Sequence, residues 1–428
     1  MNKHAIANNA LPHPDYWLAG AALVLLGLGL VMVSSTSITI GDRQLGQPFY
    51  YLIRQTFYVG AGLLAALAVL RIRLVYWEKA GTALLLLGAL LLVLVLIPGV
   101  GKHVNGSVRW LALGPVNLQV SELVKLFVVV YLAGYLVRRG AEVCTSAHAF
   151  LIPMTLLVLL AMLLLMEPDF GAAVVIIVTA LGMMFLGGVR LWQFGVLMLL
   201  AALALATLAL TSPYRLERVT SFLNPWADPY NSGFQLTQAL IAFGRGEWLG
   251  VGLGGSIQKL FYLPEAHTDF LFAVLAEELG LIGALCVIVL FAIVVWRAFA
   301  IASHAEQAGN RFAAYLAYGL GLWIALQTSI NIGVNMGVLP TKGLTLPLMS
   351  YGGSSIVASI TAISLLMRVD YELRCAPRSL QKAKLPDYPL PEVTANKFSH
   401  NLAHRPARSP VPQPARATVA AYLRERRT

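Results

Sequence analysis

The sequence predicts an all-α integral membrane protein with about ten transmembrane helices, and three observations support this fold class. Of the 428 residues, 58% are hydrophobic and 12% are charged, and the mean hydropathy is +0.72. This composition lies far from that of a soluble globular domain. Apolar stretches recur that can cross a hydrocarbon core of about 30 Å, each needing roughly 20 residues as a helix. Lys and Arg residues concentrate in alternate connections between these stretches.

The ten apolar stretches define a membrane domain over residues 17–368, after a cytoplasmic segment, 1–16, and before a C-terminal tail, 369–428. The first stretch has no convincing small-residue cleavage site, so we expect it to be retained rather than removed as a signal peptide. The stretches lie near residues 17–36, 50–70, 80–98, 119–138, 150–166, 169–187, 191–211, 269–297, 313–338 and 346–368.

The distribution of cations predicts the orientation, since Lys and Arg in short loops favour the cytoplasm. Four cations lie in the short loops on one side, namely Arg43, Lys102, Arg109 and Lys342. Nine lie on the N-terminal side: Lys3, Arg71, Arg73, Lys79, Arg138, Arg139, Arg190, Arg297 and Arg311. Both termini are therefore predicted to be cytoplasmic, and the membrane to be a bacterial inner membrane.

The tail accounts for most of the net charge of +11, because residues 368–428 hold twelve Lys or Arg against five Asp or Glu. It is rich in proline and lacks a sustained apolar period, so we expect it to be disordered. A solvated basic tail is the simpler interpretation, and attraction to anionic lipid or to a partner is the alternative. Nothing in it indicates nucleic-acid binding.

One long connection, residues 212–268, is predicted to lie on the extracytoplasmic side, and loops of this length usually carry function. Leu236, Ala239, Leu240 and Phe243 follow the spacing of an amphipathic helix, which the adjacent residues 231–232 could cap. Such a helix either lies on the membrane surface or packs against the spans.

The same loop carries the cations Arg215 and Lys259 and a glycine-rich run, 250–255. Cations and free backbone amides are what a diphosphate requires, although glycines in a loop are more often turns. The histidines His103 and His267 stand alone on the outer side, so no zinc site is predicted.

Asp269 is an acidic residue at the outer membrane surface, directly before the apolar start of the eighth stretch. One interpretation is that Thr268 or Asp269 caps a transmembrane helix. The other is a catalytic carboxylate, and the two roles could coexist.

Several polar residues lie within the predicted spans, where they usually face the bundle interior. They either line a substrate groove or hold helices together, and for the three amides we favour the second. Spacing places Glu122 near Lys125 on one helix face. The others are Glu277, Glu278, Gln327, Asn331 and Asn335.

Five sequence motifs together resemble the SEDS family of shape, elongation, division and sporulation proteins. The motif at 340–347 is more similar to the division and sporulation branches than to the elongation branch. The matching motifs are Asn105–Trp110, Pro168–Gly171, Phe222–Pro225, Tyr262–Phe270 and Asn331–Ser355.

This resemblance implies a ten-span fold and a peptidoglycan glycosyltransferase that polymerises lipid II at the division septum. The family's catalytic Asp corresponds to Asp269, which would act as general base. The implied partners are lipid II, the growing glycan strand, membrane lipids, a class B penicillin-binding protein and other divisome proteins. No cofactor is certain, and a divalent cation near Asp269 remains open. The substrate-binding residues that we expect are Arg109, Glu122, Lys125, Arg215, Lys259, His267, Glu278 and Lys342.

Two other functions fit part of the sequence. A lipid II flippase, which forms no bond, would also use intramembrane charges and a large cavity. A scaffold that only recruits the transpeptidase would leave Asp269 and the outer cations without a role. The concentration of motifs on the outer side favours the enzyme.

Overall fold

The structure, a computed structural model, is largely helical and confirms the predicted fold class. It describes residues 15–104, 107–114, 116–189, 222–231, 233–260, 262–340 and 343–375, with scattered residues between 195 and 207. The predicted seventh stretch, the first fourteen residues and the tail beyond Cys375 lie outside the described ranges.

Within those ranges a helix coincides with each of the other nine predicted stretches. The helices are α1 (Tyr16–Leu45), α2 (Tyr50–Arg71), α3 (Leu74–Leu96), α4 (Val120–Thr145), α5 (Ala147–Met166), α6 (Phe170–Leu186), α9 (Phe234–Gly246), α10 (Leu271–Gln307), α11 (Arg311–Asn335) and α12 (Gly353–Cys375), with a short 3-10 helix, η1 (Pro225–Ala227). Seven of the described helices are long and apolar enough to cross a membrane, and α6 is a shorter apolar helix.

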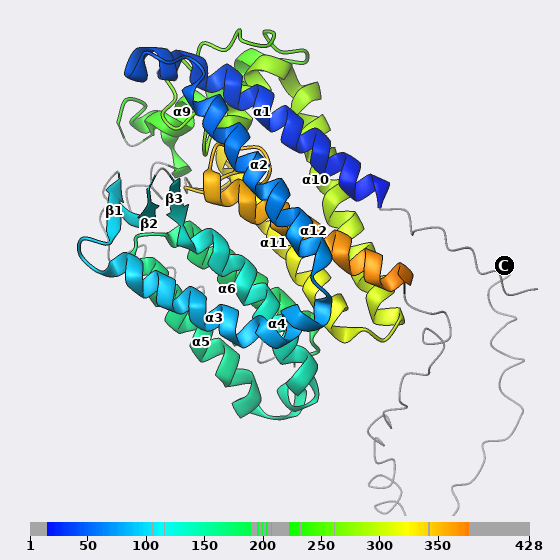
Figure 1. Ribbon diagram of the computed structural model, residues 1–428. Coiled ribbons are helices and arrows are strands. Elements are labelled where there is room, and N and C mark those ends of the chain that lie inside the picture. The colour runs from blue at the N-terminus through cyan, green and yellow to red at the C-terminus, as the bar shows by residue number, and fades with distance from the viewer. Residues whose placement is uncertain are drawn as a thin grey trace, which may run out of the picture. The chain divides into compact units, whose positions relative to one another are not determined.

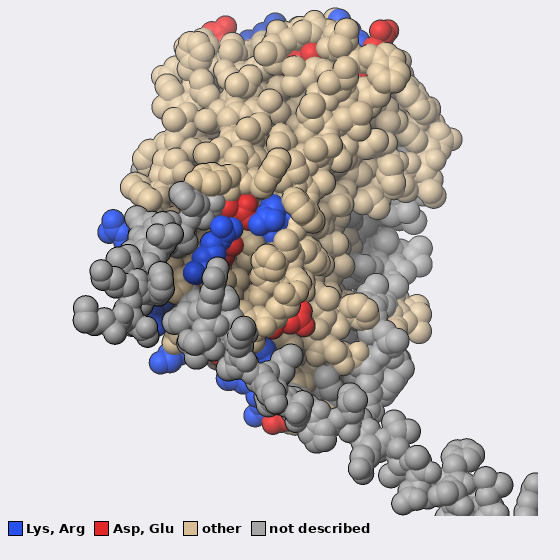
Figure 2. Space-filling view, turned by 90° about the vertical axis from the view of Figure 1, so that its right-hand side faces the viewer, with Lys and Arg blue, Asp and Glu red and all other residues tan. Residues whose placement is uncertain are grey.

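The lateral surface of the helix bundle carries many exposed apolar side chains. Leu64 of α2 is 70% exposed and Leu86 of α3 is 62% exposed, which in water would be unfavourable over so many side chains. Figure 2 shows a broad area without Lys, Arg, Asp or Glu, with charged side chains gathered along its upper edge and in the lower half of the view. These surfaces are suited to contact with lipid, as expected of a multi-pass membrane protein.

The helices pack as neighbours in an order different from that of the chain. The most extensive pairs are α10 with α11, α12 with α2, and α3 with α4, and α1 also packs along α10. In Figure 1 the start of α1 and the end of α12 lie at one end of the bundle, and α9 and the strands lie toward the other. This second end is the predicted outer side.

A small antiparallel sheet precedes α4, which the sequence analysis did not anticipate. Its strands are β1 (Gly101–Val104), β2 (Ser107–Leu113) and β3 (Val116–Gln119), in the order β1-β2-β3. Trp110 of β2 is opposite both Lys102 and Gln119. Such short strands offer too few residues for a clear alternating pattern, so the sequence predicted only a loop here.

The last predicted stretch, 346–368, is wrong at its start, because α12 begins only at Gly353 and continues to Cys375. The preceding residues 343–352 are irregular although most of them are buried. Side chains provide their hydrogen bonds. For example, the Ser350 hydroxyl accepts from the Leu346 amide at 2.9 Å, and Gln55 of α2 donates to the Ser350 carbonyl at 3.1 Å. Hydropathy alone does not distinguish such a buried loop from a helix.

Helix α10 is broken at Gly280, whose φ of 70° and ψ of −169° are not helical. The loop after α9 supplies the missing hydrogen bonds. The amides of residues 281–282 donate to the carbonyls of 247–248, and the carbonyls of 277–278 accept from the amides of 251–252, at 2.9 to 3.3 Å. A helix break in a span therefore leaves none of these backbone groups unsatisfied.

We predict that Gly280→Ala destabilises the protein by about 1–3 kcal/mol, because a side chain is strained at positive φ and its Cβ would meet backbone atoms. That Cβ would lie 2.4 Å from the Gly250 nitrogen and 2.5 Å from the Trp248 oxygen. Thermal unfolding in detergent measures the effect. Gly27→Ala is the matched control, since a Cβ there meets nothing within 4 Å. Equal unfolding temperatures for the two variants would contradict the proposed strain.

Candidate functional site

Asp269 lies immediately before α10 and is half-buried. The capping hypothesis for this residue and for Thr268 is wrong, because Phe270 occupies the N-cap position. The Thr268 hydroxyl instead donates to the carbonyl and the carboxylate of Glu265, at 3.1 and 2.7 Å. The common structural use of an acid at a helix start therefore does not account for Asp269.

Two side-chain amides of α11 hold the Asp269 backbone in place. Asn331 and Asn335 each donate from Nδ2 to the Asp269 carbonyl at 2.9 Å. Asn331 also donates to the Leu344 carbonyl at 2.6 Å, and Asn335 accepts from the Ala273 amide at 3.1 Å. The structural interpretation of these amides is thus confirmed, and it positions the catalytic candidate.

Arg109 extends from β2 to the turn between α5 and α6. Its Nε donates to the carbonyl of Glu167 at 3.3 Å, and its Nη2 donates to the carbonyl of Pro168. The other edge of the guanidinium faces Gly343. A Cβ added to Gly343 would lie 3.8 Å from Arg109 Nη1 and 3.4 Å from Asp269 Oδ2. The carboxylate and the guanidinium therefore flank the same small residue.

The turn between α5 and α6, to which Arg109 donates, contains two buried acids. Asp169 caps α6 by accepting from the Ala172 amide at 3.2 Å, and it accepts from the Ser121 hydroxyl of α4 at 2.8 Å. Glu167 is 0% exposed, and within the described part of the chain neither carboxyl oxygen has a hydrogen-bond donor. Burial, reinforced by the charge of Asp169, raises the pKa of Glu167 to about 8 although Arg109 lowers it.

His267 lies two residues before Asp269 and packs between two tyrosine rings. Its ring centroid is 5.0 Å from that of Tyr51 and 5.4 Å from that of Tyr351, and its carbonyl accepts from the Tyr351 amide at 2.9 Å. Burial lowers the pKa of His267, so the ring is neutral at pH 7. In this packing it supports the Asp269 loop, and its predicted role in substrate binding remains a prediction.

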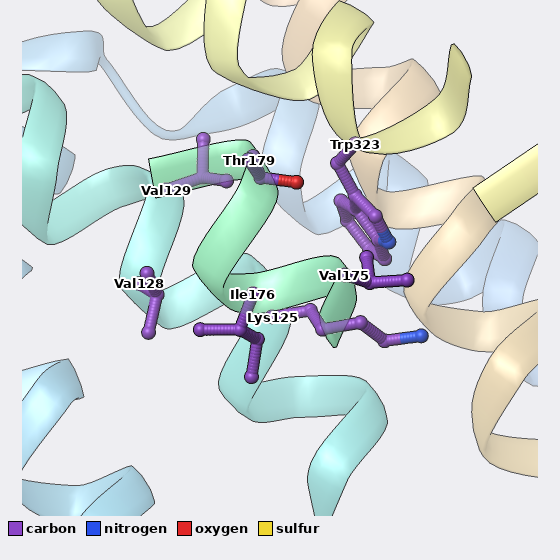
Figure 3. A pocket seen from close by; sticks show the side chains of 7 residues that line it. All are labelled: Lys125, Val128, Val129, Val175, Ile176, Thr179 and Trp323. Carbon is purple, nitrogen blue, oxygen red and sulfur yellow. The ribbon is translucent and has the colours of Figure 1, made fainter. Parts of the chain in front are cut away.

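Glu122 and Lys125 form the predicted pair on α4, deep in the bundle. Lys125 Nζ lies 2.8 Å from Glu122 Oε1 and donates to Gln327 Oε1 of α11 at 2.7 Å. Trp323 donates to the same amide oxygen at 2.8 Å. Figure 3 shows the Lys125 side chain among apolar residues of α4 and α6, with Trp323 above it. Gln327 in turn donates to the Thr345 carbonyl at 3.0 Å, which connects this cluster to the 343–352 loop.

Lys259 and Glu278 are also paired with each other, at 2.7 Å, and both contact the Ser35 hydroxyl of α1. The adjacent Glu277 accepts from Arg245 of α9 at 3.1 Å and from the Ser256 hydroxyl. These contacts fasten the outer loop to α10. The expected substrate contacts of Lys259 and Glu278 remain predictions.

The glycine-rich run forms turns rather than a phosphate nest. The amides of residues 250, 251, 252 and 255 all donate to backbone carbonyls of the chain at 2.8 to 3.0 Å. The predicted helix in this loop is confirmed as α9, which packs against α10 with Phe243 and Phe272 rings 5.8 Å apart. The predicted capping by Asn231 is wrong, because Gly233 is the N-cap, and Ser232 lies outside the described residues.

Two predicted substrate-binding residues, Arg215 and Lys342, lie outside the described ranges. Among the residues that are described, no group of three or more His, Cys, Asp or Glu side chains could hold a metal ion. The sequence analysis missed the importance of Glu167 and Gly343. Glu167 directly precedes the motif that begins at Pro168, and Gly343 lies within the motif at 340–347, but neither motif indicated what these two residues contact.

Comparison with known proteins relates this arrangement to one family. The family model described as "Cell cycle protein", which covers FtsW, RodA and SpoVE, matches residues 16–375. A probable peptidoglycan glycosyltransferase FtsW of Nitrosococcus halophilus is 64% identical over 363 residues, covering 85% of this chain and 94% of the relative. Another, of Thioalkalivibrio sulfidiphilus, is 61% identical over 358 residues, covering 84% and 90%.

Solved structures show the same fold. A chain from "Structural coordination of polymerization and crosslinking by a peptidoglycan synthase complex" has a TM-score of 0.68 and 30% identity, covering 85% of this chain and 99% of that one. The rod shape determining protein RodA of Thermus thermophilus has a TM-score of 0.63 and 26% identity, covering 84% and 97%.

We predict that Lys125→Met destabilises the protein by about 3–5 kcal/mol, because it leaves the Glu122 carboxylate buried without its cation. The double variant Glu122→Gln/Lys125→Met should lose less than the two single variants together, with a coupling of about 0.5–3 kcal/mol. Thermal unfolding of the four proteins measures this. Arg139→Met, which removes an exposed pair with Glu142 on the same helix, is the control and should cost about 1 kcal/mol or less. Additive losses at Glu122 and Lys125 would contradict the pairing.

Proposed function

Since the chain belongs to the FtsW–RodA–SpoVE family of cell cycle proteins, as its motifs predicted, we propose that it is a peptidoglycan glycosyltransferase of septal cell-wall synthesis that polymerises lipid II. The observation that carries the proposal is that Asp269 Oδ2 and Arg109 Nη1 both lie within 4 Å of the position a Cβ would take at Gly343. An acid and a cation at one outer-facing point are what this transfer requires.

The reaction joins two lipid-linked sugars. A hydroxyl of the acceptor attacks the anomeric carbon of the donor, loses its proton, and displaces undecaprenyl diphosphate. Asp269 supplies a carboxylate that can accept the proton as general base. Its backbone is fixed by two side-chain amides of α11, so the carboxylate starts from a rigid position.

Arg109 supplies positive charge for the leaving diphosphate. Its Nε and Nη2 donate to backbone carbonyls, which fixes the plane of the guanidinium and directs Nη1 toward Gly343. A preorganised cation stabilises charge that develops on the leaving group without reorganising during the reaction. The apolar surface of the bundle accommodates the isoprenoid chains of both substrates.

Membership of the same family supports a proposed partner and location. One structural relative comes from a complex described as coordinating polymerisation and crosslinking, which supports pairing with a class B penicillin-binding protein. The excess of cations on the N-terminal side supports cytoplasmic termini, so that Asp269 and Arg109 face the periplasmic side. We place the chain at the septum of the inner membrane together with other divisome proteins.

The proposal includes a divalent cation near Asp269 only as an ion that Asp269 and the substrate would bind together. The described residues offer no protein cluster that could hold it alone. Its other ligands would be diphosphate oxygens and water, the ligands that Mg²⁺ prefers. The general-base role of Asp269 does not depend on it.

The test of the proposed function is the polymerisation of lipid II by the purified protein together with its penicillin-binding partner in detergent. Glycan products on a gel support a transferase. A flippase has no bilayer to work across in detergent and forms no polymer. Movement of lipid II across vesicle membranes without any polymer would replace the proposal by that alternative.

We predict that Asp269→Asn and Asp269→Ala each lower polymerisation by about 10²-fold or more, since a general base contributes 10²–10⁴-fold. Both variants should still insert and bind the partner, which co-purification measures. Asp42→Asn, which changes an exposed acid at the outer end of α1, is the control and should polymerise normally. Near-normal activity of either Asp269 variant would exclude the general-base role.

We predict that Arg109→Lys is impaired and that Arg109→Ala is worse, because a lysine cannot reproduce the planar set of donors. If the contact strengthens as the diphosphate gains charge, the turnover number falls more than the apparent affinity for lipid II. Steady-state kinetics measures both, with Arg43→Ala of the exposed α1 end as control. An Arg109→Ala protein with wild-type turnover would remove this residue from the site.

A further inference from the structure

Glu167 is a buried acid for which the reaction described above has no use. It follows the last residue of α5, its side chain is 0% exposed, and its carboxyl oxygens have no donor within the described part of the chain. An ionised carboxylate without donors is far more costly to bury than a neutral carboxylic acid. The geometry therefore favours the protonated form.

The turn that begins with Glu167 is also the support of Arg109. The guanidinium donates to the backbone carbonyls of Glu167 and Pro168, while its opposite edge faces Gly343, which Asp269 also approaches. A negative charge on Glu167 would form within electrostatic reach of the Arg109 guanidinium, whose positive charge lowers the pKa of Glu167. Such a charge attracts the guanidinium away from the position where a diphosphate would meet it.

Among the described residues, few charged groups surround Glu167. Asp169 of the same turn raises its pKa and Arg109 of β2 lowers it, and burial is the largest cause of the rise to about 8. On α4, which packs against α5 and α6, Glu122 and Lys125 pair with each other. The charged residues of α3 and α11, Glu78, Lys79 and Arg311, lie at the opposite ends of those helices.

We propose that Glu167 is a positioning residue that keeps Arg109 directed at the substrate while it is neutral and withdraws it on losing a proton. The inference rests on the proposed function, since it acts through Arg109. Turnover should be constant from pH 6 to 8 and fall above pH 8, by about tenfold per pH unit where a single proton is essential.

The stability of the protein should also depend on whether Glu167 is protonated. The folded protein holds it up to about pH 8, whereas the unfolded chain releases it at the ordinary pKa of 4.5. The free energy of unfolding contributed by Glu167 therefore falls between these two values and is constant above pH 8. Glu167→Gln, a neutral group of the same shape, removes this fall.

The experiment measures lipid II turnover from pH 6 to 9.5 for the wild type, Glu167→Gln and Glu167→Asp, each with the penicillin-binding partner. The turnover of Glu167→Gln should match that of the wild type at pH 7 within about twofold and should not fall above pH 8. The turnover of Glu167→Asp, which keeps a carboxyl group, should still fall at high pH. Asp370→Asn, at a buried acid paired with Arg374 on α12, is the control and should keep the wild-type profile.

Three results would overturn the proposal. In the first, Glu167→Gln loses turnover at high pH with the same midpoint pH as the wild type. In the second, Glu167→Gln is inactive at pH 7. In the third, Glu167→Gln cannot be purified as a folded protein. Thermal unfolding against pH is independent of activity, and the advantage of Glu167→Gln over the wild type should grow between pH 4.5 and 8. Failure of the wild type to polymerise at any pH would instead refute the proposed function.

Discussion

The need to satisfy buried backbone groups is the constraint on which this structure depends. Irregular backbone within a membrane domain is tolerated only where other protein groups provide its hydrogen bonds. Here the amides of Gln327, Asn331 and Asn335 bind the carbonyls of Thr345, Leu344 and Asp269. One polar stripe on α11 thereby holds both the start of α10 and the 343–352 loop. Asp269 and Gly343 owe their proximity to it.

The cations around the site divide into two groups. Lys125 with Glu122 and Lys259 with Glu278 are matched at 2.8 and 2.7 Å, so each charge is compensated within the chain. Such pairs determine which helices and loops meet, and removing one member is costly. Arg109 instead rests on backbone carbonyls and retains its full charge toward the site. That difference distinguishes the cations that form ion pairs within the chain from Arg109, which we propose acts on the leaving diphosphate.

Several features of the site could be predicted from the sequence because they depend on neighbours along one helix. The Glu122–Lys125 pair follows from their spacing on α4, and α9 follows from its apolar period. The start of α12 and the cap of α10 could not be predicted in this way. Their hydrogen bonds come from Gln55 and Asn335, on helices distant in the sequence.

The sequence by itself determined the membrane class, the described helices at nine of the ten predicted stretches and the family, and it singled out Asp269 as a candidate, because hydrophobic length and contiguous motifs are local properties. Only the tertiary structure decided which charges are mutually compensated and which acid is buried in the turn that binds Arg109. Spacing gave no indication that Glu167 would be buried without a donor, since burial depends on how β2, α4 and the 343–352 loop pack around one turn. The electrostatic environment of a residue is a property of its spatial neighbours, and those are set by the fold.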